Sequence, residues 1–192
     1  DDIFDFGQLN DLINVILPSM FFGNKKDPLK EGTLGKGFHL VPLDIKDNRD
    51  NYCHLYHINV KVSDTVFRLG GISNGFSKGN YCNLIQYDTI GNKKIINNIK
   101  QIETGGNHCI IDDTGKIVLK STSCLRTPYY LKGCLAVMDS VYYNLLTQKE
   151  IVKGDHTINS EKYLFVENRY NKDYRFGVYK IDYETGEYEI FE

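Results

Sequence analysis

Apolar and polar residues alternate along the segment RFGVYKIDYETGEYEIFE, residues 175–192, on both sides of a Thr-Gly pair. A period of two places successive side chains on opposite faces of a β-strand. Glycine supplies the positive φ that a tight hairpin turn requires. The pattern therefore predicts a β-hairpin with Gly186 in its turn.

Three earlier segments have the same layout of strand, turn and strand, and they span residues 81–96, 108–119 and 142–152. The clearest is HCIIDDTGKIVL, in which the turn DTGK joins two apolar runs. Aligned on their turns, the four copies are centred on Gly91, Gly115, Gln148 and Gly186. These positions are unequally spaced, so we interpret the segments as a degenerate array of hairpins. Stacked hairpins can bury the apolar faces that one hairpin alone cannot.

The pattern upstream of this array is less regular. The segment CHLYHINVKV, residues 53–62, predicts one strand that continues into TVFRLGGI, and residues 70–80 are expected to form a loop. The better core face of the first strand carries His54, Tyr56, Ile58, Val60 and Val62. Turn-forming and charged residues dominate positions 23–51, where we expect one short strand near Phe38–Leu43.

Helical spacing occurs once, near the start of the sequence. Apolar side chains in residues 5–17 recur at steps of three and four, which draws one face of an amphipathic helix that ends at Pro18. We expect this helix to pack on the β core, and a partner-binding or membrane-surface helix is the alternative. We therefore divide the chain into a helix with a turn-rich connection, residues 1–51, and a β-hairpin repeat domain, residues 52–192.

Residues 80–192 resemble the β-rich WG (or KWG) repeat family of bacterial proteins. The hairpin IIDDTGKIVL and the segment YYLKGCLAVMDS match the turn and the spacer of that family, and Phe176-Gly177 matches its aromatic-glycine pair. The hairpins are also similar to the outer strands of β-propeller blades. The chain departs from the family in having no Trp. The resemblance implies an interaction module and transfers no catalytic residues.

Composition narrows the classes of function. A hydrophobic fraction of 41% is ordinary for a globular domain, and the net charge of −2 disfavours nucleic-acid binding through broad neutralisation of phosphates. No apolar run reaches the roughly 18–20 residues that span a bilayer. We therefore expect neither a nucleic-acid partner nor a membrane span, and the compartment stays open.

The five cysteines are widely spaced and form no CxxC pair; they are Cys53, Cys82, Cys109, Cys124 and Cys134. Buried free thiols are the prediction, and one or two disulfides are the alternative. Thiolate and imidazole groups also suit zinc, which makes Cys53, His57 and His108 candidate metal ligands. Core cysteines and half-exposed histidines are the competing interpretation, and we predict no cofactor.

Tyrosine is the most informative residue type for binding, because it offers a large contact area with few rotatable bonds and a polar tip. The candidate ligand-binding residues are Tyr129, Tyr130, Tyr142 and Tyr143. The motif Gly71-Ile72-Ser73-Asn74-Gly75 matches a hydrolase nucleophile elbow, but the helix that this motif needs does not follow it.

These observations predict a mainly antiparallel β fold of hairpin repeats, propeller-like or WG-repeat-like, with one N-terminal amphipathic helix. The expected function is a non-catalytic module that binds a protein or a cell-surface ligand. The alternatives are a metal-dependent enzyme that uses the cysteine and histidine residues, and a protein that neutralises a toxin.

Overall fold

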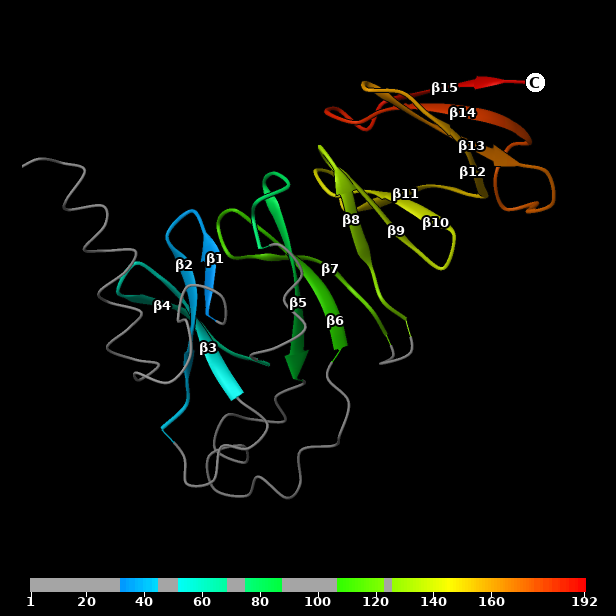
Figure 1. The fold of residues 1–192 in the computed structure, drawn as a ribbon. Coiled ribbons are helices and arrows are strands. Elements are labelled where there is room, and N and C mark those ends of the chain that lie inside the picture. The colour runs from blue at the N-terminus through cyan, green and yellow to red at the C-terminus, as the bar shows by residue number, and fades with distance from the viewer. Residues whose placement is uncertain (1–31, 45–51, 69–74, 88–106, 123–125) are drawn as a thin grey trace, which may run out of the picture.

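A computed structural model describes residues 32–44, 52–68, 75–87, 107–122 and 126–192 (Figure 1). The expected helix of residues 5–17, the turn at Gly91 and Ser73 of the Gly-rich motif lie outside these residues. The described chain is mainly β, and all its sheets are antiparallel. None of the described residues belongs to a helix long and apolar enough to cross a bilayer.

The first sheet has seven strands in sequence order. They are β1 (Thr33–Gly35), β2 (Phe38–Pro42), β3 (Tyr52–His57), β4 (Val60–Arg68), β5 (Tyr81–Tyr87), β6 (Asn107–Asp112) and β7 (Ile117–Lys120). The strand expected near Phe38–Leu43 is therefore confirmed as β2. Because β2 pairs with β3 from Phe38 to Pro42, the domain boundary expected at residue 51 falls inside this sheet.

The second and third sheets are four-stranded meanders. The second contains β8 (Tyr129–Lys132), β9 (Leu135–Met138), β10 (Val141–Asn144) and β11 (Lys149–Lys153). The third contains β12 (Asp155–Asn159), β13 (Tyr163–Asn168), β14 (Gly177–Asp182) and β15 (Tyr188–Phe191). Only Gly154 separates β11 from β12, so the chain passes directly from one sheet to the next. The hairpins predicted at residues 108–119, 142–152 and 176–191 are all present.

The segment at 53–62 is a hairpin, not the single strand that its pattern predicts. The chain reverses at Ile58 and Asn59, and Ile58 has a φ of 54°. The core face is also the opposite one, because Cys53 and Leu55 are buried whereas Val60 is 65% exposed. A left-handed conformation is rare for a β-branched residue, so Asn59 is the one local signal of this turn.

One apolar cluster joins the three sheets, and a second lies within the first sheet. The larger one draws residues from all three sheets, among them Ile110 in β6, Val152 in β11 and Ile181 in β14, each with an exposed fraction of 0%. The second cluster covers the other face of the first sheet, around Leu55 and Ile111. The second sheet therefore lies between the first and the third (Figure 1).

Three hairpin turns share one side-chain device, an Asp or Asn at the end of the strand that enters the turn. Asp112 Oδ1 accepts hydrogen bonds from the backbone N–H groups of Thr114 and Lys116. Asn144 and Asp182 each accept two backbone N–H bonds from their own turns, after β10 and β14. Such local bonds satisfy backbone donors that the strand ladder leaves free.

The turns after β8 and β10 contact the turn after β14 and so join the second sheet to the third. Asn144 Nδ2 donates to the carbonyl oxygen of Thr185 at 3.0 Å, and the backbone N–H of Cys134 donates to the carbonyl oxygen of Tyr183 at 2.6 Å. A Cβ on Gly186 would lie 2.2 Å from Asn144 Nδ2, so the two turns are in direct contact. These contacts between turns therefore orient the third sheet relative to the second.

A second asparagine joins the first sheet to the second. Asn83 in β5 donates through Nδ2 to the carbonyl oxygen of Pro128 at 2.6 Å. Its Oδ1 accepts from the backbone N–H of Tyr130 at 3.2 Å. The Asn83 side chain thus makes the two backbone hydrogen bonds that a neighbouring strand would make at the start of β8. Both junctions between sheets therefore depend on a side-chain amide.

We predict that the substitutions Asn144→Ala and Asn144→Asp separate the two tasks of this residue. Alanine removes the bonds within the turn and the bond to Thr185, which should lower the free energy of unfolding by about 1–3 kcal/mol. Aspartate keeps the acceptor for the turn but sets a carboxylate against the Thr185 carbonyl in place of a donor, so it should destabilise the junction between the sheets. Urea denaturation measures the free energy of unfolding of both variants.

The matched control is Thr147→Ala, which changes an exposed side chain in the same turn and leaves its backbone N–H bond to Asn144 in place. This variant should unfold at the urea concentration of the parent protein. An Asn144→Asp protein as stable as the parent would contradict a stabilising role for the bond to Thr185.

Candidate functional site

The four candidate tyrosines do not form one exposed surface. Tyr129 is 62% exposed, but Tyr130 and Tyr142 are core residues with exposed fractions of 8% and 6%. Tyr143 is half-buried, and its hydroxyl donates to Glu150 Oε1 at 3.3 Å. Strand alternation buries every second side chain, so adjacent tyrosines in β8 and β10 cannot both face solvent. Of these candidates, Tyr129 is therefore the most accessible to a ligand.

The candidate metal ligands lie apart in the first sheet. Cys53 is fully buried in β3, whereas His57 is exposed at the end of that strand, with its ring 4.7 Å from the ring of Phe38. His108 is in β6, with two strands between it and β3, and it shares the face of Ile110 instead of the face of Cys53. Within the described residues, no group of three or more His, Cys, Asp or Glu side chains could hold a metal ion.

The four described cysteines are free and buried, as predicted; they are Cys53, Cys82, Cys109 and Cys134. Burial raises the pKa of Cys82 and that of Cys109 to about 12. Because the thiolate is the reactive form of cysteine, these two side chains are chemically inert in the folded protein. Cys124 lies outside the described residues.

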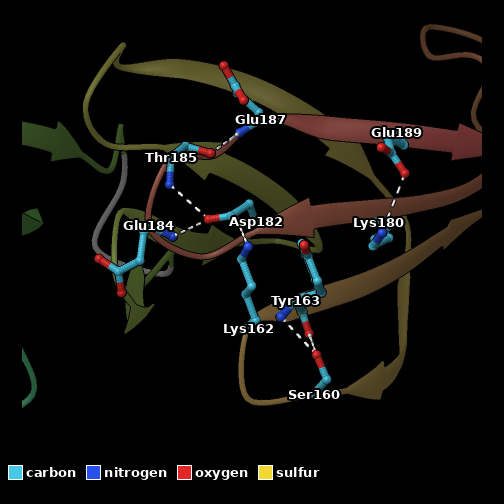
Figure 2. Close-up of polar contacts among 9 residues, drawn as sticks. All are labelled: Ser160, Lys162, Tyr163, Lys180, Asp182, Glu184, Thr185, Glu187 and Glu189. Carbon is cyan, nitrogen blue, oxygen red and sulfur yellow. Dashed lines mark hydrogen bonds and ion pairs between the residues drawn. The ribbon is translucent and has the colours of Figure 1, made fainter.

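An open groove of about 710 Å³ runs over the outer face of the third sheet, the face turned away from the second sheet (Figure 2). Its lining is Lys162, Tyr163, Lys180, Asp182, Gly186, Glu187, Tyr188 and Glu189. Of these, Tyr188 directs its ring toward Tyr179 on the inner face of the sheet. Alternation along β13 and β14 places Tyr163, Lys180 and Asp182 on the face opposite the core. The packing that holds the third sheet in place therefore leaves the groove on its free face.

Two lysines lie against the ring of Tyr163 in this groove. Lys180 Nζ is 4.4 Å and Lys162 Nζ is 5.1 Å from the ring centroid, both within the range of cation–π attraction. A side-chain hydrogen bond to Tyr163 raises the pKa of Lys162 above its ordinary value. The ammonium group of Lys162 is therefore held near the ring in its charged form.

Carboxylates complete the charge pattern of the groove. Lys180 Nζ lies 3.4 Å from Glu189 Oε2, and Lys162 Nζ lies 3.7 Å from Asp182 Oδ2 (Figure 2). Burial raises the pKa of Asp182, but the backbone N–H groups of its turn and the charge of Lys162 together outweigh burial. The pKa of Asp182 is therefore below its ordinary value, and the carboxylate is ionised at neutral pH.

The groove combines one aromatic ring, two cations and several carboxylates on a rigid sheet. Such a surface can pair with both signs of charge and can stack against an apolar or planar group. Its openness suits a ligand that lies across the sheet better than one that must be enclosed.

Sequence analysis does not single out Tyr163, Lys180 or Glu189. The alternation of the segment KYLFVEN places Tyr163 opposite the core positions Leu164 and Val166, and the register of the last hairpin places Glu189 beside Lys180. The alternation in the sequence is enough to place Tyr163 on the outer face of its own strand. Only the pairing of β13 with β14 places Tyr163 and Lys180 on the same face of the sheet.

We predict that Cys53, Cys82 and Cys109 resist alkylation by iodoacetamide at pH 8 in the native protein and react fully in 8 M urea. The reason is that burial both excludes the reagent and disfavours the thiolate. Mass spectrometry of digested protein reports each site separately, and the unfolded sample is the control. Rapid labelling of Cys82 or Cys109 in the native protein would contradict their burial in the core of the first sheet.

No protein-family model, curated protein or solved structure matches this chain. The resemblance of residues 80–192 to the WG repeat family therefore stays a prediction.

Proposed function

We propose that the chain is a non-catalytic binding module that takes a protein ligand on the outer face of its third sheet. The observation that carries this proposal is the open groove in which Tyr163 lies between Lys162 and Lys180 and is bordered by carboxylates. Tyrosine and neighbouring charges are typical of protein interfaces, where an aromatic anchor contributes much of the affinity.

The scaffold in this proposal is an array of β-hairpin repeats, of the WG-like or propeller-like kind. Its support is the device shared by three turns, in which Asp112, Asn144 and Asp182 each cap the turn that follows them. Repeated hairpins stacked face to face give a rigid core and leave an outer face free for a ligand. A binding site on rigid strands loses little conformational entropy when its ligand binds.

The mixed charge of the groove favours a protein over an anionic polymer. Lys162 and Lys180 are already paired with Asp182 and Glu189, so the groove offers no excess of positive charge. Such paired charges give specificity for a complementary pattern of charges. A protein surface or segment supplies both signs of charge together with apolar groups.

We predict that Tyr163→Ala lowers capture of the native partner from an extract of the source cells by at least about tenfold, because loss of a central aromatic anchor often costs 2 kcal/mol or more. The measurement is affinity capture with immobilised protein and quantitative mass spectrometry. The contacts of Ser160 with the backbone of Tyr163 remain in this variant, so its melting temperature should be close to that of the parent.

The matched control is Tyr170→Ala, which removes an 82% exposed tyrosine that is not part of the groove. This variant should capture the same partner at the level of the parent protein. Equal capture by the parent and by Tyr163→Ala would overturn the proposal that the groove is the binding surface.

A further inference from the structure

The strand β15 is an edge of the third sheet, and among the described strands it pairs only with β14. The backbone N–H of Asp182 donates to the carbonyl oxygen of Glu187, which fixes the phase of this antiparallel ladder. In such a ladder, alternate residues direct their backbone groups toward the partner strand. Glu187 and Glu189 therefore face β14, and the N–H and C=O groups of Tyr188 and Ile190 point away from the sheet.

The regularity of β15 sets it apart from the other edge strands. In the described part of the chain the edges of the three sheets are β1, β7, β8, β11, β12 and β15. The ladders of the first five each contain a register shift. The ladder of β15 runs through four consecutive pairs without one. Bulges blunt an edge against further pairing, so β15 is the edge best able to accept another strand.

The side chains of β15 define what such a strand would carry. On the outer face, Glu187 and Glu189 are exposed beside the groove, and on the inner face Tyr188 and Ile190 lie near Tyr179. Cross-strand neighbours of opposite charge stabilise a sheet and like charges destabilise it. A second copy of β15 would place carboxylates against carboxylates. An incoming strand with lysine or arginine on one face and apolar residues on the other is complementary.

We propose that the edge of β15 binds a basic, extended segment of a partner protein, which adds to the third sheet as a fifth strand. This inference rests on the proposed function, in which the outer face of the same sheet is the binding surface. Backbone hydrogen bonds to Tyr188 and Ile190 supply affinity, and the carboxylates of Glu187 and Glu189 select basic side chains. The groove around Tyr163 then takes side chains from the same partner.

The test uses the full chain and three labelled hexapeptides. The first alternates lysine and valine, the second has the same sequence with an N-methyl group on each valine, and the third replaces lysine with glutamate. When lysines lie opposite Glu187 and Glu189, the valine N–H groups are the ones that bond to β15. Fluorescence polarisation should therefore detect binding of the first peptide, at least about tenfold weaker binding of the second, and none of the third.

Two further measurements locate the bound peptide. Saturation with the first peptide should slow amide hydrogen exchange at Tyr188 and Ile190 by at least about tenfold, with little change at Glu189, whose amide already faces β14. The variants Glu187→Gln and Glu189→Gln should each weaken binding by about two- to fivefold. The control Glu161→Gln, which neutralises an exposed carboxylate outside β15, should bind like the parent.

The proposal is overturned if the first peptide does not bind, if the N-methylated peptide binds equally well, or if exchange at Tyr188 and Ile190 is unchanged. These outcomes differ from failure of the proposed function. If Tyr163→Ala loses partner capture but the parent protein does not bind the first peptide, strand addition is wrong and the groove remains the proposed binding surface. If the parent protein binds the peptide but Tyr163→Ala still captures the partner fully, strand addition stands and the proposal for the groove is wrong.

Discussion

The side-chain amide of Asn144 makes hydrogen bonds in two sheets at once, and the arrangement of the third sheet depends on it. Its oxygen accepts from the turn after β10, and its nitrogen donates to the carbonyl of Thr185 in the turn after β14. Only a glycine at position 186 allows the two turns to approach this closely. Apolar burial supplies most of the attraction between the sheets, but burial is not directional. The bonds between turns select one orientation.

This orientation decides which residues are available for binding. With Leu164, Val166 and Ile181 packed against the second sheet, the alternate residues of β13 and β14 must face outward. Tyr163, Lys180 and Asp182 thus share one face, and β15 adds Glu187 and Glu189 beside them. The groove and the free edge are consequences of the core, because neither requires a loop to take a particular conformation.

Sequence reasoning succeeds here where a short-range signal exists. Strict alternation and a glycine after Asp-Thr or Glu-Thr identified the hairpins around Gly115 and Gly186, and the layout alone identified the hairpin at Gln148. It failed at residues 53–62, where Ile58 adopts a positive φ that its side chain disfavours. Asn59 is the only turn-forming residue there, and the alternation of apolar residues continues through it, so the pattern predicts one strand with the wrong core face.

The candidate site was less predictable for a different reason. Tyr130 and Tyr142 were chosen by residue type, but burial depends on which face of β8 and β10 meets the core, and both side chains are inside. Cys53 and His108 lie on opposite faces of a sheet whose order includes two strands between them. Both the burial of these tyrosines and the separation of Cys53 from His108 depend on contacts between residues far apart in the sequence. The alignment of the hairpins does not mark the capping residues at one position, because Asp112 lies three residues before its turn glycine and Asp182 lies four residues before its own.

The central claim is that the junctions between turns make the three sheets one cooperative unit that presents the outer face of the third. Native-state hydrogen exchange at Ile110, Val152 and Ile181, one buried residue in each sheet, tests it most directly. The account predicts that the three amides open with the same free energy, within about 1 kcal/mol, and with the same dependence on denaturant. Opening of Ile181 at a much lower free energy than Val152 would show a separately unfolding third sheet and would contradict the account.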